Sequence, residues 1–306
     1  MHVTFIAATL VVATCIGPAA CAGGASGSSA GSSSASSSSS AGIAFDASGV
    51  ADGAASGSDG SASGDSSDGG LRTNVAPGAN FDLSLWELQL PIGSTGDPTT
   101  ISPTQLEGSS GFEDAYFYTD PTDGAMTFWD PEDGVTTADS SYPRSELREM
   151  NADGTEANWP IEGTNTLTAT LAVLDVPDHV CVGQIHIGSA IEAGLASSTK
   201  PLLELYYYDN GNIIVGIEDS PSGSQTENSI TNVPPGTPFS YSIQLTGDGT
   251  ITLTIDGATS SFPMPASFDG YGEYFKAGDY DQTAGADAAV GATVKFYALR
   301  VTHTSS

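Results

Sequence analysis

Three short runs of the chain collect side chains that can act on an acidic substrate. They are residues 144–148 (RSELR), 184–186 (QIH) and 274–282 (YFKAGDYDQ). The whole chain has only 7 Lys and Arg against 37 Asp and Glu, yet three of these cations and one of the 4 histidines lie in the runs. Basic side chains bind carboxylates, and amide, imidazole and phenol groups add further hydrogen bonds. The pattern predicts one site for an acidic sugar polymer.

The first run has the pattern of a strand with one polar face. Successive side chains alternate, so Arg144, Glu146 and Arg148 share one face while Ser145 and Leu147 share the other. The two arginines are four residues apart, roughly 13 Å at the strand rise, which suits successive acidic units of a polymer with Glu146 orienting both. The alternative is a surface Arg-Glu-Arg ladder that contributes little stability.

The second run places Gln184 and His186 on one face of a strand, with Ile185 and Ile187 in the core behind them. By itself this pair is equally compatible with a structural histidine. Cys181 is expected to be a small buried hydrophobe. We predict no metal site, because no second His or Cys lies at ligand spacing.

The third run also alternates. Lys276, Gly278 and Tyr280 share one face, and Phe275 and Ala277 share the other. Gly278 would allow a substrate or a neighbouring strand to approach closely. The alternative is an ordinary strand with an exposed tyrosine and lysine.

The rest of the chain predicts an all-β domain. Short segments rich in β-branched and aromatic residues are separated by Gly, Asp and Pro. They cover residues 86–90, 115–118, 126–129, 166–174, 202–208, 212–217, 239–245, 251–255 and 294–301. No window predicts a helix of ten or more residues, and residues 189–198 suit one short turn at most. This pattern indicates a β-sandwich or jelly roll and disfavours a parallel sheet.

The N-terminal part predicts an export signal followed by a tether. An apolar run at residues 3–12 is too short to span a membrane, and it indicates a signal peptide over residues 1–22. Residues 23–76 are mostly Ser, Gly and Ala, which cannot offset the entropy of ordering, so a disordered linker is expected there. The folded domain is expected over residues 77–306, with no membrane-spanning segment.

Cys21 follows small residues and precedes the Ser/Gly-rich segment, as in a bacterial lipoprotein acylation site. The alternative is an ordinary secreted protein in which Cys21 is removed or idle. The predicted localisation is secreted or extracellular, with lipid anchoring at Cys21 as one form of it.

Charge excludes several partners. The predicted domain keeps 6 of the 7 cations and 32 of the 37 acids, which leaves a formal charge of −26. Such a domain does not suit nucleic acid or an anionic membrane. The domain has a single cysteine, so no disulfide can form within it.

Taken together, the three runs, in this order and spacing, resemble the alginate lyases of polysaccharide lyase family seven. Residues 81–91 (FDLSLWELQLP) resemble the opening of that family's domain, and the resemblance extends over residues 81–302. Asp279 and Asp281 occupy variable positions of the third motif. The second of these is commonly Asn in the family, so we expect the extra charge to alter affinity at a local subsite.

The resemblance implies a concanavalin-like jelly-roll sandwich whose concave face binds alginate and cleaves it by β-elimination. It implies Arg144, Gln184 and His186 as the groups that neutralise the uronate carboxylate. For guluronate, His186 would be the base and Tyr280 the acid, whereas for mannuronate Tyr280 would serve as both. The binding residues implied are Glu146, Arg148, Tyr274, Lys276 and Gln282.

The resemblance also implies a monomer without a cofactor. Ile185, between Gln184 and His186, accompanies guluronate-containing substrates in the family, so these blocks are slightly favoured. Two alternatives stay open. A glycoside hydrolase on the same fold would need two facing carboxyl groups. A non-catalytic uronan-binding module would not need both His186 and Tyr280.

Overall fold

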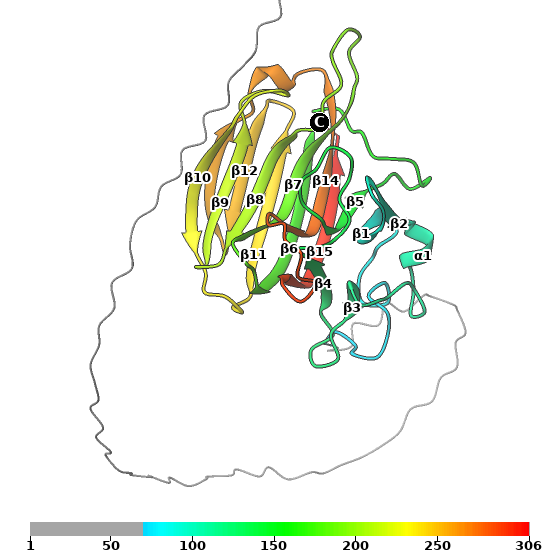
Figure 1. Ribbon diagram of the computed structural model, residues 1–306. Helices are drawn as coiled ribbons and strands as arrows, with labels where there is room; N and C mark the ends of the chain where they lie inside the picture. Colours follow the sequence, from blue (N-terminus) through cyan, green and yellow to red (C-terminus); the bar gives the residue numbers. More distant parts are fainter. Residues whose placement is uncertain (1–69, 306) are drawn as a thin grey trace, which may run out of the picture. The chain divides into compact units, whose positions relative to one another are not determined.

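We describe residues 70–305 of the chain, taken from a computed structural model. The predicted signal peptide, Cys21 and nearly all of the predicted linker lie outside these residues. The described part is almost entirely β-structure, in two antiparallel sheets that pack face to face as a jelly-roll sandwich (Figure 1). This confirms the predicted fold class.

The first sheet has eight strands in the order β10-β9-β8-β7-β14-β5-β1-β2. Their bounds are β1 (Trp86–Ser94), β2 (Asp97–Ile101), β5 (Ser145–Glu149), β7 (His179–Ala190), β8 (Pro201–Tyr208), β9 (Asn212–Glu218), β10 (Gln225–Asn232) and β14 (Tyr271–Asp281). Strands β5, β7 and β14 contain the three runs predicted to form the site, and they are neighbours in this sheet.

The second sheet has seven strands in the order β13-β12-β11-β6-β15-β4-β3. Their bounds are β3 (Phe117–Thr119), β4 (Met126–Pro131), β6 (Thr164–Asp175), β11 (Phe239–Thr246), β12 (Thr250–Ile255), β13 (Ala258–Pro263) and β15 (Gly291–Thr304). The described helical segments are α1 (Pro103–Leu106) and the 3-10 turn η1 (Ala266–Phe268). None of the described helices is long and apolar enough to cross a membrane.

Alternating side chains fill the space between the sheets. Ile243 and Leu253 of the second sheet are fully buried, as are Leu147, Ile185 and Phe275 of the first. Burying such a side chain fully stabilises the fold by roughly 1.5–3 kcal/mol.

In β5, in β14 and in β7 from Ile185 onward, the residues that contribute to this core have odd numbers. Their even-numbered neighbours therefore face outward, which aims the predicted site residues away from the core. The earlier core residues of β7, Val180 and Val182, are even-numbered because the register shifts between Cys181 and Gly183.

The predicted hairpin over residues 202–217 is confirmed. Strands β8 and β9 pair antiparallel, and the turn between them contains Gly211 at φ 82°. Glycine adopts this left-handed conformation without steric cost.

Three strands were not indicated by the sequence pattern. β2, β10 and β13 are edge strands, and their sequences DPTTI, QTENSITN and ATSSFP contain few apolar residues. An edge strand pairs on one side only, and these three place few side chains in the core, so apolar alternation is weak. The stretch 189–198, expected to form one short turn, contains a non-helical turn at residues 193–194; β7 continues to Ala190 before it, and irregular backbone follows.

Candidate active site

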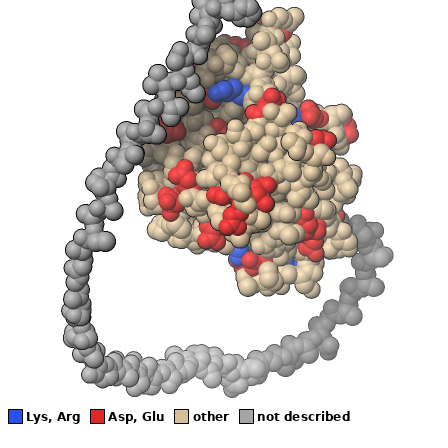
Figure 2. Space-filling view, in the orientation of Figure 1, with Lys and Arg blue, Asp and Glu red and all other residues tan. Residues whose placement is uncertain are grey.

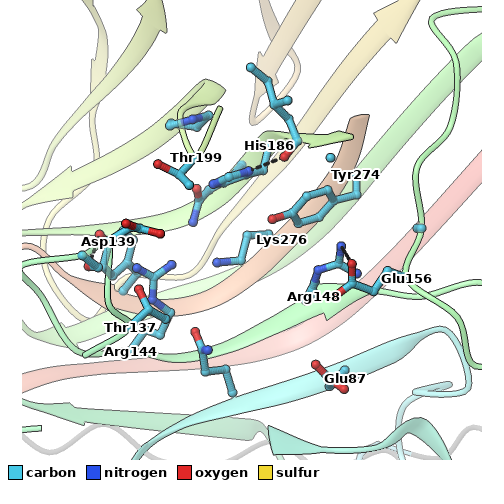
Figure 3. A pocket seen from close by; sticks show the side chains of 18 of the residues that line it. Glu87, Thr137, Asp139, Arg144, Arg148, Glu156, His186, Thr199, Tyr274 and Lys276 are labelled. Carbon is cyan, nitrogen blue, oxygen red and sulfur yellow. Dashed lines mark hydrogen bonds and ion pairs between the residues drawn. The ribbon is translucent and has the colours of Figure 1, made fainter. Parts of the chain in front are cut away.

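A groove with a volume of about 660 Å³ lies over the outer face of the eight-stranded sheet. Its floor comes from six strands and its walls from the loops that contain residues 137–140, 156–158 and 198–199. Figure 3 shows side chains of these strands and loops converging on it. Seven of the predicted site residues line the groove: Arg144, Arg148, Gln184, His186, Tyr274, Lys276 and Tyr280.

One register row crosses the floor of the groove. Glu87 of β1 pairs with Arg148 of β5, and Arg148 pairs with Lys276 of β14. Lys276 pairs with Gln184 of β7, which pairs with Glu204 of β8. Adjacent strands lie about 4.8 Å apart, so the row offers one side chain at each such step. Two cations and an amide occupy its middle, and a carboxyl group stands at each end.

Glu146 lies beneath this row and does not line the groove. Its side chain is 0 % exposed. Lys276 forms an ion pair with Oε2, Gln184 donates to Oε1, and Nη1 of Arg144 lies 3.4 Å from Oε2. A buried carboxylate with such partners compensates the cost of burying the cations. Glu146, predicted to bind substrate, is thus placed to orient the residues that line the groove.

His186 is held with one ring nitrogen open to the groove. Its Nδ1–H donates to the carbonyl oxygen of Ile187 at 2.8 Å, and its ring stacks on Tyr274 with centroids 5.0 Å apart. This hydrogen bond selects the tautomer with an unprotonated Nε2. Burial, together with the charge of Lys276, lowers the pKa of His186 to about 3. The imidazole is therefore neutral near pH 7, as a proton acceptor must be.

Tyr280 lies at the end of the groove formed by Arg144 and the loop before β5. The guanidinium carbon of Arg144 is 3.8 Å from the centroid of the tyrosine ring. Ser140 lies within hydrogen-bond distance of the phenolic oxygen. Burial raises the pKa of Tyr280, and both Arg144 and Ser140 act against that rise. The phenol is therefore protonated near pH 7, as a proton donor must be.

The opposite end of the groove is formed by Arg148. Its guanidinium carbon lies 4.1 Å from the ring centroid of Tyr274, and Nη2 lies 3.2 Å from a carboxylate oxygen of Glu156. Figure 3 shows Glu156 and Glu87 near Arg148, whereas Asp139 lies near the Arg144 end. The cations of the groove are thus framed by carboxyl groups.

Four further residues singled out by the sequence lie outside the groove. Gln282 does not line the groove, and its Nε2 donates to the backbone oxygen of Tyr280 at 3.2 Å. Asp279 and Asp281 are each 0 % exposed, on the core side of β14, where the backbone N–H of Asp281 donates to Asp130 at 3.0 Å. They cannot contact a polymer, so the expectation that their charge alters a subsite is wrong. Cys181 is buried and free, as predicted.

Sequence reasoning missed many residues of the groove, among them Ser140 and Glu204. Ser140 belongs to an irregular loop, whose conformation no periodicity predicts. Glu204 lies on a strand that was predicted, at an even-numbered position next to Gln184, so strand pairing would have identified it.

The groove gathers three of the few cations of an acidic molecule. The whole chain carries a formal charge of −30. On the face drawn in Figure 2, Asp and Glu are spread widely, while Lys and Arg appear at only a few points. The cations at the groove, Arg144, Arg148 and Lys276, are three of the 7 in the chain. An open groove that combines these cations with a neutral imidazole and a protonated phenol suits an enzyme that acts on an anionic polysaccharide.

The chain belongs to the alginate lyase family, and it is a polysaccharide lyase. The family model described as alginate lyase matches residues 81–303. An alginate lyase from Klebsiella pneumoniae is 29% identical over 286 residues, which span 74% of this chain and 91% of that protein.

Solved structures agree with this assignment. The alginate lyase A1-II′, a member of polysaccharide lyase family 7, is 38% identical and superimposes with a TM-score of 0.66, covering 76% of this chain and 100% of that one. A variant of the same enzyme, with a histidine replaced by asparagine and a tyrosine by phenylalanine, was solved in complex with substrate (GGMG). It is 36% identical, with a TM-score of 0.66, covering 76% of this chain and 98% of that one.

Proposed function

We propose that the chain cleaves alginate by β-elimination, which leaves 4,5-unsaturated uronate ends, and that it favours guluronate-containing blocks. The observation that carries this proposal is the placement of a neutral imidazole and a protonated phenol in one groove with carboxylate-binding groups. The relatives named alginate lyases support the same substrate.

The first requirement of this reaction is to neutralise the uronate carboxylate. The C5–H bond next to a carboxylate anion is a weak acid, because its loss accumulates negative charge. Fixed donors on the carboxylate stabilise that charge in the transition state. Arg144 and Gln184 are suited to this task, since Glu146 holds both from beneath. Lys276 and Arg148 bind the carboxylates of other uronate units of the same polymer along the register row.

The second requirement is a base for C5–H and an acid for the leaving oxygen. For guluronate, Nε2 of His186 takes the C5 proton. The C–H electron pair forms the C4=C5 double bond, the C4–O4 bond breaks, and the phenol of Tyr280 protonates O4. For mannuronate, Tyr280 takes both roles: its phenolate form takes the C5 proton, and the phenol so formed protonates O4. No water is consumed in the cleavage step.

The preference for guluronate rests on two observations. His186 is neutral and has a free ring nitrogen, which provides a base distinct from Tyr280. Ile185 separates Gln184 from His186, as the family resemblance associates with guluronate-containing substrates. Initial rates on polyguluronate, polymannuronate and mixed blocks test this preference. Faster cleavage of polymannuronate would contradict it.

The decisive experiment is product analysis after incubation with alginate. A lyase gives products that absorb in the ultraviolet through the new conjugated double bond, and the mass of the fragments shows no added water. A hydrolase gives reducing ends with added water and no such absorbance. A binding module gives neither.

We further propose that the protein is exported and acts as a monomer. The apolar run at residues 3–12 and the small residues before Cys21 support export. Fractionation of the producing cells, with mass spectrometry of the mature N-terminus, tests export and acylation together. Light scattering of the purified protein tests the monomer.

A further inference from the structure

A carboxyl group lies on the floor of a groove proposed to bind polyuronate. Glu204 of β8 pairs with Gln184 in the register row, lines the groove and is 8 % exposed. A carboxyl group at this position opposes a charged substrate. The proposed reaction assigns no role to this carboxyl group.

The contacts of Glu204 fix the direction of its carboxyl group. The hydroxyl of Tyr206 donates to Oε2 at 2.5 Å, and Nε2 of Gln225, from edge strand β10, donates to the same oxygen at 2.8 Å. Within residues 70–305 no hydrogen bond reaches Oε1. Two donors on one oxygen hold the group rigidly and leave the other oxygen to the groove.

The row beyond Gln184 also lacks positive charge. Glu204 pairs with Gly216 of β9, which offers no side chain. Lys200, on the same side, lies 3.1 Å from Glu218 and does not line the groove. The last cation of the row is therefore Lys276, two strands or about 10 Å from Glu204, with the neutral Gln184 between them.

We propose that Glu204 is a specificity-determining residue, whose free carboxylate oxygen disfavours a charged uronate unit over β8 and so ends the stretch of groove that holds ionised units on this side. This inference rests on the proposed function and adds a boundary to its substrate site. Like charges placed opposite each other in an interface cost binding energy and exclude the wrong partner.

Protonation would weaken this exclusion. Burial raises the pKa of Glu204, and Glu146 acts in the same direction, while the hydrogen bonds from Tyr206 and Gln225 and the charge of Arg144 oppose it. The other titratable groups that face it are Cys181 and Tyr280. In acid the neutral carboxyl group donates a hydrogen bond to a uronate, whereas at higher pH the carboxylate repels it.

The test is Glu204→Gln, which keeps the shape of the side chain. Its amide oxygen accepts the bonds from Tyr206 and Gln225, and its NH₂ group faces the groove. We expect KM for polyguluronate near pH 8 to fall on the order of five- to tenfold, with kcat nearly unchanged. This reduction in KM should become smaller as the pH falls, and it should be absent for the shortest oligomers. Glu113→Gln, at an exposed position outside the groove, removes the same charge and should leave KM unchanged.

A binding measurement separates the two levels of the proposal. In the Tyr280→Phe background, calorimetry with oligoguluronates should show the same gain in affinity from Glu204→Gln. If the wild-type protein cleaves alginate but Glu204→Gln leaves KM and affinity unchanged at every pH, the role of Glu204 is wrong and the proposed function stands. If the wild-type protein neither cleaves nor binds alginate, the proposed function and the role of Glu204 are both wrong.

Discussion

The hydroxyl of Ser140 lies 3.0 Å from the phenolic oxygen of Tyr280, although the two residues are 140 positions apart in the chain. Ser140 also donates to the carbonyl oxygen of Tyr142 at 2.9 Å, so in this arrangement the serine oxygen accepts a hydrogen bond from the phenol of Tyr280. When Tyr280 gives its proton to a leaving group, the serine hydroxyl can turn and donate to the phenolate.

This contact predicts the effect of Ser140→Ala. Loss of one hydrogen bond of about 1 kcal/mol should reduce kcat roughly fivefold and leave KM nearly unchanged. Removal of a donor should also move the ionisation of Tyr280 to higher pH in the pH profile of kcat. Ser140→Thr keeps the hydroxyl and should retain most of the activity. An alanine variant with wild-type kcat and pH profile would refute the role.

Tyr280→Phe should abolish turnover, because the phenylalanine cannot protonate O4. Binding should remain nearly intact, since Arg144, Gln184 and Lys276 are untouched. Ultraviolet absorbance measures turnover, and calorimetry with an alginate oligomer measures binding. Activity comparable to that of the wild type would remove Tyr280 from the mechanism.

The activity should fall at alkaline pH through Lys276. Burial, and next the charge of Arg144, lower the pKa of Lys276 to about 8, although Glu146 opposes the shift. The ammonium that binds a uronate is therefore present below this value and lost above it, so kcat/KM should decline as the pH passes about 8. Lys276→Arg keeps its charge and should move the decline to higher pH. If Lys276→Arg leaves the alkaline decline of kcat/KM unchanged, that decline arises from another group.

Stability should also fall as the pH rises, through Asp279. Burial raises the pKa of Asp279 well above its ordinary value, with Asp130 and Asp281 acting in the same direction. The folded protein thus binds this proton more tightly than the unfolded chain does. Its contribution to stability is full below the ordinary carboxyl pKa of about 4 and is lost as the pH rises.

Asp279→Asn removes this dependence. The melting temperature at pH 8 should exceed that of the wild type by a few degrees, on a scale of about 2–4 °C per kcal/mol, and the difference should vanish near pH 4. Asp97→Asn, at an exposed position, is the control and should change little. A lower melting temperature for Asp279→Asn at pH 8 would contradict the prediction.

Much of the fold followed from alternation along the strands. The parity of Arg144 and Arg148 placed them correctly on the outer face, opposite Leu147 in the core. Alternation could not identify β10, whose side chains are polar on both faces. Alternation does place Asp279 on the face of Phe275 and Ala277, and it would have predicted that this carboxyl group is buried.

Part of the site also followed from alternation and strand pairing. Gln184, His186 and Lys276 lie on strands that pair, so their meeting follows from register. Ser140 reaches Tyr280 through loop geometry that depends on tertiary contacts. Glu146 was predicted both to orient the two arginines and to bind substrate, because parity gives a face but not a depth, and the structure buries it in contact with Arg144.

The position of Glu146 has a consequence for engineering. One carboxylate contacts Arg144, Gln184 and Lys276, so a substitution at any of these four residues alters the electrostatic environment of the others. Effects of combined changes there will not add. Altered substrate range is more readily obtained at Glu204, whose hydrogen-bond partners are Tyr206 and Gln225 and which makes no direct contact with that shared carboxylate.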